Sequence, residues 1–502
     1  MEGKTARSVP LVIAVDLSTT ACKAIAFGTE GEVVASARVP IETANPRPGW
    51  LEQDPLDWWR ATRETLRTLT AQIDRGRVRA IAVTHQRETF VCLDADERPV
   101  RPAILWLDTR ATAQAESVGS PEIHEITGRP PSSTPTFYKL LWMREHEPQL
   151  LARTAMVADV HAYLVRQLTG GWATSWASAD PTGLVDVRTF DYATPLVAMT
   201  GLEPAQLPRL VAPGEAVGTV TERAAGETGL PAGLPVVAGA GDGHCAGLGA
   251  AVTGPGQAYL NLGTAVLVGV HSDSYRTDLA YRTLASPIAG RWTLETALAS
   301  GVHSVEWFRR EMLRDTSAVA LERIETEASA VPAGADRLLF LPYLVRAEAP
   351  HWDPAARGAW VGLRDHHGLG HLYRALLEGI AFEQRLVLGL IEEDTGVTTT
   401  RLRLMGGGAR SRLWVQVIAD ILERPAEVTQ HSETTALGAA VLAAAGVGVE
   451  GEHDVAATAA RMSQGWREIR PEMTDRERYR RRFAAYQELY PALAGIFRQL
   501  AD

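Results

Sequence analysis

One acid stands among closely spaced glycines in the stretch VVAGAGDGHCAGLGA, residues 236–250. Glycine allows the backbone to approach a ligand closely, so this acid, Asp242, would be presented in a cleared space. A carboxylate within hydrogen-bond reach of a hydroxyl can act as a general base. Asp242 could instead cap a helix that begins at His244, which is a common role for aspartate. The local sequence supports both interpretations equally.

A second acid lies in a polar insert between two apolar runs, in LVIAVDLSTTACKAIAF, residues 11–27. This pattern predicts a β-hairpin whose turn carries one carboxylate and three hydroxyls. A similar pattern, QAYLNLGTAVLVGV, spans residues 257–270. Alignment of the two inserts pairs Asp16, Ser18 and Thr19 with Asn261, Gly263 and Thr264. The repeat predicts two domains of one design that face each other, although two unrelated hairpins with polar turns would look the same.

A third candidate site is the glycine loop GGGARS, residues 406–411. A short apolar run at 402–405 leads into it, and a helical pattern at 413–422 follows it. Strand, glycine loop and helix is an arrangement that accepts a nucleotide against bare backbone and a helix N-terminus. Three adjacent glycines could also form a flexible turn, but the flanking strand and helix favour the ligand interpretation.

Charged residues also follow the apolar run 78–83, in the segment THQRE. The carboxyl end of a strand in an α/β domain usually lines a crevice where ligands bind. Arg87 and Glu88 are therefore candidate ligand contacts, although side by side they could form a simple surface ion pair. The run 103–108 predicts a second edge of the same pocket, and it contains Trp106, a residue type that more often belongs to the core.

Other periodic segments supply the scaffold for these residues. Residues 55–73 and 371–390 have an apolar face at helical spacing, and 434–446 is a helix of small residues. Apolar runs at 90–93 and 336–344 predict strands, and 474–490 predicts a solvated helix rich in Arg and Glu.

Length and composition limit what these sites can belong to. A chain of 502 residues is too long for one ordinary core and predicts two large domains or more. The formal net charge of -10 is spread without acidic or basic blocks, which argues against binding to nucleic acid or to an anionic membrane. The N-terminus has no apolar signal core, and no run approaches the ~18 apolar residues of a membrane-spanning helix. We therefore expect a cytoplasmic protein.

The three cysteines, Cys22, Cys92 and Cys245, are widely scattered and form no CxxC pair. Their spacing predicts neither a disulfide framework nor a zinc site, and it fits a reducing compartment.

Nine segments together resemble, in order, the conserved blocks of the FGGY carbohydrate kinases. They are AVDLSTTACKAIAF, GWLEQDPLDWW, VTHQRETFVCLD, AILWLDTRA, VVAGAGDGHCAGLGA, YLNLGTAVLVG, FLPYL, HLYRALLEGIAF and LMGGGARSRLWVQVIADIL. The resemblance extends from about Leu11 to Gly446, nearly the whole chain, and is far more specific than any one motif.

The resemblance implies an α/β fold of two duplicated actin- and hexokinase-like (ribonuclease H-like) domains with a cleft between them. Residues 1–243 would form the sugar-binding domain and 244–502 the ATP-binding domain. ATP and Mg²⁺ are the implied cofactors, and Asp242 matches the family's catalytic base. Phosphate and nucleotide binding is implied for Ser18, Thr19, Thr20, Gly263, Thr264, Gly407, Gly408, Ala409 and Arg412, and metal binding for Asp16 and Asp242.

The substrate is predicted from departures within the family. Arg87 and Glu88 resemble the pair with which glycerol and related polyol kinases clamp neighbouring hydroxyls, where typical bacterial xylulokinases carry Met-His. Trp106 falls near the aromatic wall of the glycerol site. Thr134 and Gly243, however, replace a Tyr and a Gln of glycerol kinases. The smaller residues predict an enlarged pocket and favour a four- or five-carbon polyol or ketose, with glycerol and xylulose as further candidates.

Two other functions are considered. Residues 241–246 fit a relaxed dinucleotide fingerprint, but the acid expected ~20 residues later for the ribose is replaced by Asn261, which argues against an NAD-dependent oxidoreductase. A non-catalytic sugar-sensing protein on the same fold would be indicated by loss of Asp242, Asp16 or a phosphate-binding threonine, and all are present. The expected partners are a small sugar or polyol and ATP, and a homodimer is a further candidate.

Overall fold

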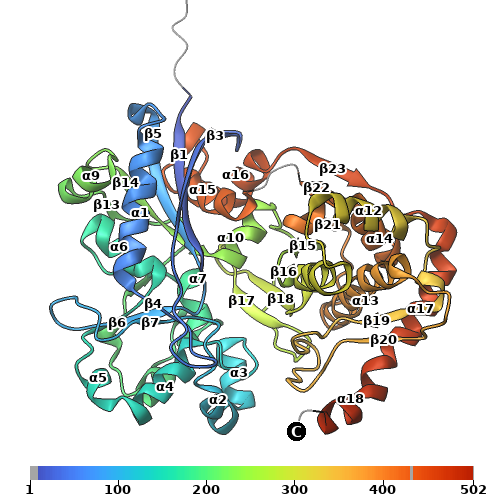
Figure 1. Cartoon of the computed structure of the whole chain (residues 1–502). Helices are drawn as coiled ribbons and strands as arrows, with labels where there is room; N and C mark the ends of the chain where they lie inside the picture. Colours follow the sequence, from blue (N-terminus) through green and yellow to red (C-terminus); the bar gives the residue numbers. More distant parts are fainter. Residues whose placement is uncertain (1–8, 430–432, 501–502) are drawn as a thin grey trace, which may run out of the picture.

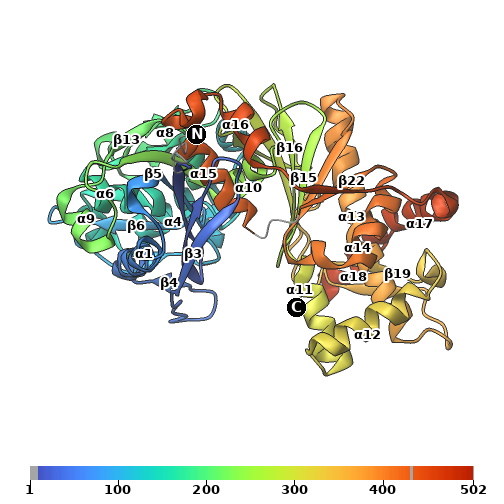
Figure 2. The same ribbon diagram turned by 90° about the horizontal axis from the view of Figure 1, so that it is seen from above.

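The computed structural model describes residues 9–429 and 433–500. The chain forms two α/β halves, each built on its own sheet, and Figures 1 and 2 show helices covering both sheets. No helix within the described ranges is long and apolar enough to cross a membrane.

The first sheet has six strands in the order β13-β14-β5-β1-β2-β3. Their bounds are β1 (Leu11–Leu17), β2 (Ala21–Phe27), β3 (Val33–Pro40), β5 (Val78–His85), β13 (Ala216–Thr219) and β14 (Pro235–Gly241). Strands β1, β5 and β14 are parallel to one another, whereas β2, β3 and β13 pair antiparallel. The hairpin predicted from residues 11–27 is confirmed as β1 and β2.

The second sheet has seven strands in the order β17-β18-β16-β15-β21-β22-β23. Their bounds are β15 (Gln257–Leu262), β16 (Val266–Ser272), β17 (Arg282–Ala285), β18 (Trp292–Leu298), β21 (Arg401–Met405), β22 (Ala426–Thr429) and β23 (Trp466–Ile469). The run β18-β16-β15-β21-β22 repeats the pattern of β3-β2-β1-β5-β14, three antiparallel strands followed by two parallel ones. The two halves therefore share one design, as the repeated hairpin predicted.

The alternation of apolar residues along β1 explains how helices cover both faces of the first sheet. Leu11, Ile13 and Val15 belong to a core shared with α1 (Pro55–Thr70) and α6 (Val160–Thr169). Val12 and Ala14 belong to a core shared with α10 (Asp242–Gly249) and α15 (Thr434–Gly446). Side chains of successive strand residues point to opposite faces, so one apolar run serves both layers.

Helix α15 returns to the first sheet after the chain has built most of the second, and in Figure 1 it lies among the blue and green elements. Its small residues permit close packing: a Cβ on Gly438 would lie 1.9 Å from the carbonyl oxygen of Cys245 in α10. The predicted division into residues 1–243 and 244–502 stays a prediction. Helices α10 and α15 belong to the second of these ranges, but they pack on the first sheet.

The remaining elements complete the two halves. In the first half, β4 (Glu52–Gln53), β7 (Ala103–Ile104), β6 (Phe90–Leu93) and β8 (Met156–Asp159) form a small sheet, accompanied by helices α2 (Thr112–Val118), α3 (Pro121–Thr127), α4 (Thr136–His146), α5 (Pro148–Ala152), α7 (Trp176–Ala179), α8 (Thr194–Thr200) and α9 (Glu222–Thr228) and by strands β9 (Ala173–Ser175), β10 (Val185–Asp186), β11 (Asp191–Tyr192) and β12 (Arg209–Val211). The second half adds α11 (Gly301–Trp307), α12 (Ala318–Ser329), β19 (Leu339–Leu341), β20 (Ala359–Val361), α13 (Leu369–Thr395), α14 (Arg412–Leu422), α16 (Val455–Met462), α17 (Arg476–Gln487) and α18 (Leu489–Gln499). Of these, α16 packs beside α15 on the first sheet.

Candidate active site

Three parallel strands of the first sheet end together and bring the predicted residues to one edge. Asp16 pairs in register with Thr84, and Gly241 pairs with His85. The carboxyl ends of β1, β5 and β14 therefore meet, which is where α/β sheets bind ligands. Each of these ends carries a predicted residue. Asp16 lies near the end of β1, Arg87 and Glu88 come shortly after β5, and Asp242 directly follows β14.

Asp242 is the first residue of α10, and Gly241 is the N-cap. The helix thus begins two residues earlier than expected, and the interpretation of Asp242 as a cap for a helix starting at His244 is wrong. Its Oδ1 accepts a hydrogen bond from the Gly243 amide at 2.8 Å and forms an ion pair with Arg87 Nε at 3.0 Å. The side chain keeps 45% of its surface exposed. It is thus anchored through one oxygen and accessible to a ligand.

Asp16 lies half-buried near the end of β1. Burial, followed by the negative charge of Asp242, raises the pKa of Asp16 to about 7, and Lys23 opposes this shift. Within the described ranges, no hydrogen bond or ion pair engages its carboxylate. Carboxylate oxygens are ligands that Mg²⁺ prefers, and a bound cation would relieve the repulsion between the two acids. The residues present fit a divalent cation at this edge.

Arg87 and Glu88 are buried, with 7% and 6% of their surface exposed, and they do not pair with each other. Arg87 bridges Asp242 and Glu295, with Nη1 3.1 Å from Oε1 of Glu295. Glu88 accepts a hydrogen bond from Arg129 Nη1 at 2.8 Å. The interpretation as a surface ion pair is therefore wrong. Glu88 also has a φ of 58°, a left-handed conformation that costs a non-glycine residue roughly 1–2 kcal/mol and is found at functional sites.

The first polar turn is tied to the same edge through Trp106. Trp106 Nε1 donates to Thr19 Oγ1 at 3.0 Å, and Thr19 in turn donates to Gln86 at 3.0 Å. The Ser18 hydroxyl donates to the carbonyl of Ala21 at 2.9 Å and so closes the turn, whereas Thr20 is exposed. The predicted phosphate-binding residues of this turn thus differ in what their hydroxyls already contact.

The second sheet brings the other predicted phosphate and nucleotide residues together in the same way. Asn261 of β15 pairs in register with Met405 of β21, so the turn containing Gly263 and Thr264 lies beside the glycine loop. Thr264 is exposed. The two candidate ATP-binding segments, far apart in sequence, share one sheet edge.

The glycines of the loop are not equivalent. A Cβ on Gly407 would meet nothing within 4 Å. A Cβ on Gly408 would lie 2.6 Å from Cζ3 of Trp414 and 2.9 Å from Cβ of Leu262. Gly408 therefore faces the core, Ala409 is buried, and Arg412 is exposed at the start of α14. The open surface of this loop is at Gly407.

Gly243 has a different role from the one expected. A Cβ there would lie 2.7 Å from Cζ of Arg87, so the space next to Gly243 holds the guanidinium group. The expectation that Gly243 enlarges the sugar pocket is therefore wrong, because the arginine fills the volume. Thr134, whose Oγ1 lies 3.1 Å from Ser132 Oγ, is half-buried and is the remaining small replacement.

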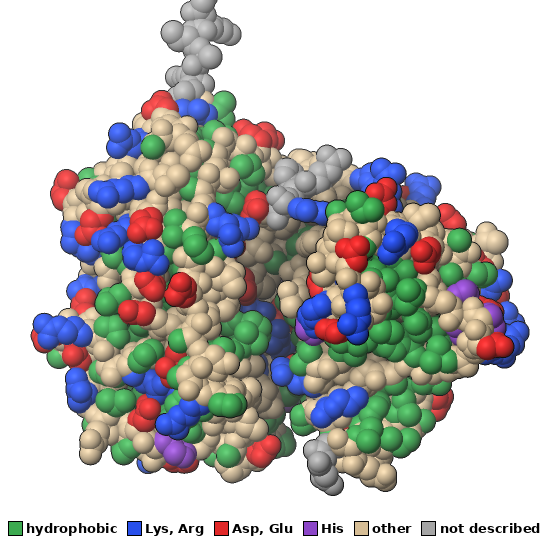
Figure 3. All heavy atoms as spheres, in the orientation of Figure 1, with side chains coloured by type: hydrophobic (Ala, Val, Ile, Leu, Met, Phe, Trp, Pro, Cys, Tyr) green, Lys and Arg blue, Asp and Glu red, His purple; other side chains and the backbone are tan. Residues whose placement is uncertain are grey.

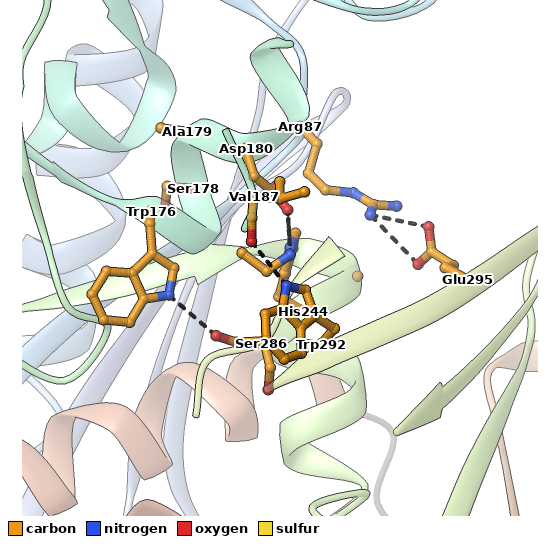
Figure 4. A network of polar contacts seen from close by, with 12 residues as sticks. Arg87, Trp176, Ser178, Ala179, Asp180, Val187, His244, Ser286, Trp292 and Glu295 are labelled. Atoms are coloured by element: carbon orange, nitrogen blue, oxygen red, sulfur yellow. Dashed lines mark hydrogen bonds and ion pairs between the residues drawn. The ribbon is translucent and has the colours of Figure 1, made fainter. Parts of the chain in front are cut away.

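Sequence reasoning missed three buried charged residues at the site: Arg129, Asp180 and Glu295. Asp180 Oδ2 accepts a hydrogen bond from the amide of Ala285 in β17 at 2.7 Å and lies 3.3 Å from His244 Nε2 (Figure 4). Glu295 is fully buried in β18. A charged residue inside an apolar strand, as in TLETAL, was the available signal for Glu295.

Figure 3 shows a hollow between the two halves. A pocket of about 480 Å³ also lies between them, lined by α3 and by residues 275–279. Its lining does not include Asp16, Arg87 or Asp242, so the predicted chemistry lies elsewhere on the boundary between the halves.

A cluster of Asp336, His366 and His367 has the composition of a metal site. His366 Nε2 lies 2.7 Å from Asp336 Oδ2. His367 Nδ1 accepts a hydrogen bond from the Arg364 amide, and His367 Nε2 lies 3.8 Å from Asp336 Oδ2. Asp336 is thus already paired with His366, whereas His367 Nε2 has no hydrogen-bond partner among the described residues.

Two domains with one strand order, and acids and glycine turns at their sheet ends, define a two-domain sugar kinase architecture. The N-terminal domain model of the FGGY family of carbohydrate kinases matches residues 11–249, and the C-terminal domain model matches residues 258–447. The chain therefore belongs to the FGGY family of carbohydrate kinases.

Individual relatives agree with this assignment. The xylulose kinase of Escherichia coli is 32% identical over 86% of this chain and 89% of its own length. The glycerol kinase of Saccharopolyspora erythraea is 32% identical over 93% of this chain and 96% of its own length. The crystal structure of xylulose kinase from Rhodospirillum rubrum superposes with a TM-score of 0.89 at 30% identity, covering 97% of this chain and 100% of that chain. A sugar sensor and an oxidoreductase gain no support.

Proposed function

We propose that this kinase transfers the γ-phosphoryl group of ATP to a hydroxyl of a small polyol or ketose, with four or five carbons favoured. The family makes the protein an ATP-dependent phosphotransferase that acts on a sugar hydroxyl. The similarity to xylulose kinases supports a five-carbon ketose, and the similarity to a glycerol kinase keeps shorter polyols as candidates.

The observation that carries this proposal is the burial of Arg87 and Glu88, with Arg87 paired to Asp242. Buried charged groups that are not paired with each other can make strong, charge-assisted hydrogen bonds to a ligand. The strained backbone of Glu88 is the kind of conformation that persists where a ligand must be held. Together they support a clamp for neighbouring hydroxyls next to the proposed base.

In this arrangement Asp242 takes the proton of the attacking hydroxyl. Phosphoryl transfer has a loose transition state with charge spread over phosphate oxygens, so a weak carboxylate base acting late is sufficient. Asp242 is suited to this because its carboxylate is fixed through Oδ1 and exposed to a ligand. Arg87 orients it and lies within reach of the sugar.

The nucleotide lies against the second domain. We propose that the turns containing Thr19, Thr20, Gly263 and Thr264 bind phosphates and that the open backbone at Gly407 faces the nucleotide. Asp16, with Asp242, would hold Mg²⁺, which neutralises phosphate charge when bound. Closure of the two domains would exclude water and limit wasteful ATP hydrolysis.

An ATP-consumption screen tests this function. Purified protein is given ATP and glycerol, erythritol, the pentitols or the pentuloses, and ADP release is compared with a blank without sugar. We expect strong stimulation by at least one four- or five-carbon compound. Stimulation by none of these compounds would contradict the proposal. The predicted cytoplasmic location and the homodimer stay predictions.

A further inference from the structure

The Arg87 side chain is held from both domains. Its Nε contacts Asp242 of the first domain at 3.0 Å, and its Nη1 contacts Glu295 of the second at 3.1 and 3.4 Å. Figure 4 shows Arg87 extending toward Glu295, which projects from a strand of the second domain. These two residues are separated by 208 positions in the chain. The proposed sugar contact, Arg87, is thus held in part by Glu295, which belongs to the second domain and not to the sugar-binding domain.

Glu295 is surrounded by donors that keep it charged and in place. Arg282 Nε donates to its Oε1 at 2.7 Å, and the Tyr259 hydroxyl donates to Oε2 at 3.0 Å. Burial opposes ionisation, but Arg282 and then Arg87 outweigh it and hold the pKa of Glu295 well below its ordinary value. A buried anion with five contacts from three residues, Arg87, Arg282 and Tyr259, is a rigid anchor for the guanidinium group of Arg87.

The glycines on either side of Asp242 leave space for the side chain of Arg87. A Cβ on Gly241 would lie 2.6 Å from Arg87 Cγ, and a Cβ on Gly243 would lie 2.7 Å from Cζ. Side chains at these two positions would push the arginine away from Glu295. The glycine spacing that marked this stretch in the sequence therefore serves the arginine as well as the acid.

We propose that Glu295 is a positioning residue: it holds Arg87 in its sugar-binding orientation, so that the sugar site is complete only when the two domains are closed. This inference rests on the proposed function, because it takes Arg87 to contact the sugar. When the domains separate, Glu295 leaves with the second domain. Asp242 is then the ion-pair partner that remains for Arg87 among the described residues. The proposed base, Asp242, and the proposed sugar contact, Arg87, would then pair with each other.

Other hydrogen bonds also connect the two domains at the β17–β18 hairpin. Trp292 Nε1 donates to the carbonyl of Val187 at 2.8 Å, and Trp176 Nε1 donates to the carbonyl of Ser286 at 3.2 Å (Figure 4). The amide of Ala285 donates to Asp180. In this structure these hydrogen bonds join the hairpin to the first domain, and they must break together with the Arg87–Glu295 contact when the domains separate.

The first test compares Glu295→Gln with Glu378→Gln. Glu378 is a matched control, because it is buried in α13 and accepts hydrogen bonds from Arg374 at 2.7 Å and Tyr479 at 3.1 Å, with no contact to the site. We expect Glu295→Gln to lower kcat/KM for the sugar about 10²-fold or more while KM for ATP changes little. Glu378→Gln should lower thermal stability and leave both constants near wild type. Unchanged kcat/KM in Glu295→Gln, or an equal loss in the two variants, would overturn the inference.

Two further variants show whether Glu295 acts through Arg87. Glu295→Asp keeps the charge but retracts it by one methylene, and it should recover part of the lost kcat/KM. In an Arg87→Met background, Glu295→Gln should add less than about threefold, because residues that act as a unit are not additive. Multiplicative losses in the double variant would mean that Glu295 acts independently, contrary to the proposal.

Domain closure has a readout that does not need the sugar. We expect small-angle X-ray scattering of the ligand-free proteins to give a larger radius of gyration for Glu295→Gln than for wild type and Glu378→Gln. An unchanged radius would overturn the link to closure. This result is separate from the sugar screen, so failure of the proposed function, with no sugar phosphorylated by wild type, is distinguishable from failure of this inference.

Discussion

Arg87 Nε lies 3.0 Å from Oδ1 of Asp242, and this contact joins the end of β5 to the start of α10. It places a buried guanidinium group beside a half-exposed carboxylate. The same carboxylate oxygen accepts the Gly243 amide, which leaves Oδ2 free of hydrogen bonds and ion pairs within the described ranges. An acid held in this way can receive a proton without moving.

Replacement of this acid gives the first prediction. Asp242→Asn should reduce kcat by roughly 10²-fold or more, the usual scale for a general base. Asparagine keeps an oxygen for the Gly243 amide, so the start of α10 should stay as it is. The affinities for ATP and sugar should change only a few-fold. Steady-state kinetics and calorimetric binding measure the two effects. Near-normal turnover would assign Asp242 a structural role.

The glycine loop gives a prediction in which two neighbouring glycines behave differently. Gly407→Val should raise KM for ATP strongly and leave sugar affinity and thermal stability close to wild type, because nothing lies within 4 Å of its Cβ. The main effect of Gly408→Val should be a loss of thermal stability, since its side chain would collide with Trp414 and Leu262. The sequence resemblance implied nucleotide contacts for both glycines and singled out neither of them.

These two variants are compared by ATP titration of the initial rate and by thermal unfolding. An unchanged KM for ATP in Gly407→Val would show that the loop is a turn without a nucleotide contact.

The hydroxyl clamp gives a third prediction. Glu88→Ala should lose most of kcat/KM for the true substrate and much less for the analogue that lacks the bound hydroxyl, because a site built to bond a hydroxyl rejects its deoxy analogue by ~10⁴-fold or more. The variant also leaves Arg129 without its 2.8 Å partner. Kinetics with the substrate identified in the screen, and with its deoxy forms, measure the difference.

Glu97 provides a matched control for this experiment. It is also a glutamate with positive φ, 61°, and it pairs with Arg166, but at an exposed position. Glu97→Ala should change stability by less than about 1 kcal/mol and leave the kinetics unaltered. Equal kinetics for wild type and Glu88→Ala would contradict the clamp without affecting the family assignment.

A buried carboxyl remote from the cleft gives a prediction about pH. Burial raises the pKa of Glu383 to about 7, although Tyr486 and Tyr343 donate hydrogen bonds to it. The unfolded chain ionises this group near its ordinary value of 4.5, so the folded protein binds more protons between about pH 4.5 and 7. Stability from this group is therefore present below pH 4.5 and is lost as the pH rises through 7.

Glu383→Gln removes the charge that burial opposes. Relative to wild type, its free energy of unfolding should increase with pH across this window by up to about 3 kcal/mol, an order-of-magnitude figure. Denaturant unfolding at several pH values measures the difference. Glu322→Gln, on the exposed surface of α12, serves as control and should follow wild type. A pH-independent difference for Glu383→Gln would contradict the raised pKa.

The local signals in the sequence were sufficient for the scaffold and for part of the site. The apolar runs around Asp16 and around Asn261 predicted two matching hairpins, since strand alternation and turn chemistry depend on neighbouring residues. They are observed as β1-β2 and β15-β16. The strand that leads into the glycine loop was predicted for the same reason.

The partners of the buried charges were decided only by the tertiary structure. Arg87 meets Glu295 and Glu88 meets Arg129, whereas the sequence placed Arg87 and Glu88 next to each other as one pair. Gly243 holds open a space for an arginine, and α15 returns to the first sheet from the end of the chain. Hydrophobic periodicity and turn residues act over a few positions, but an ion pair or a close backbone contact depends on which distant segments folding brings together. The sequence by itself determined the strands, the turns and the acids at their ends, and packing within and between the two domains determined what those acids and arginines touch.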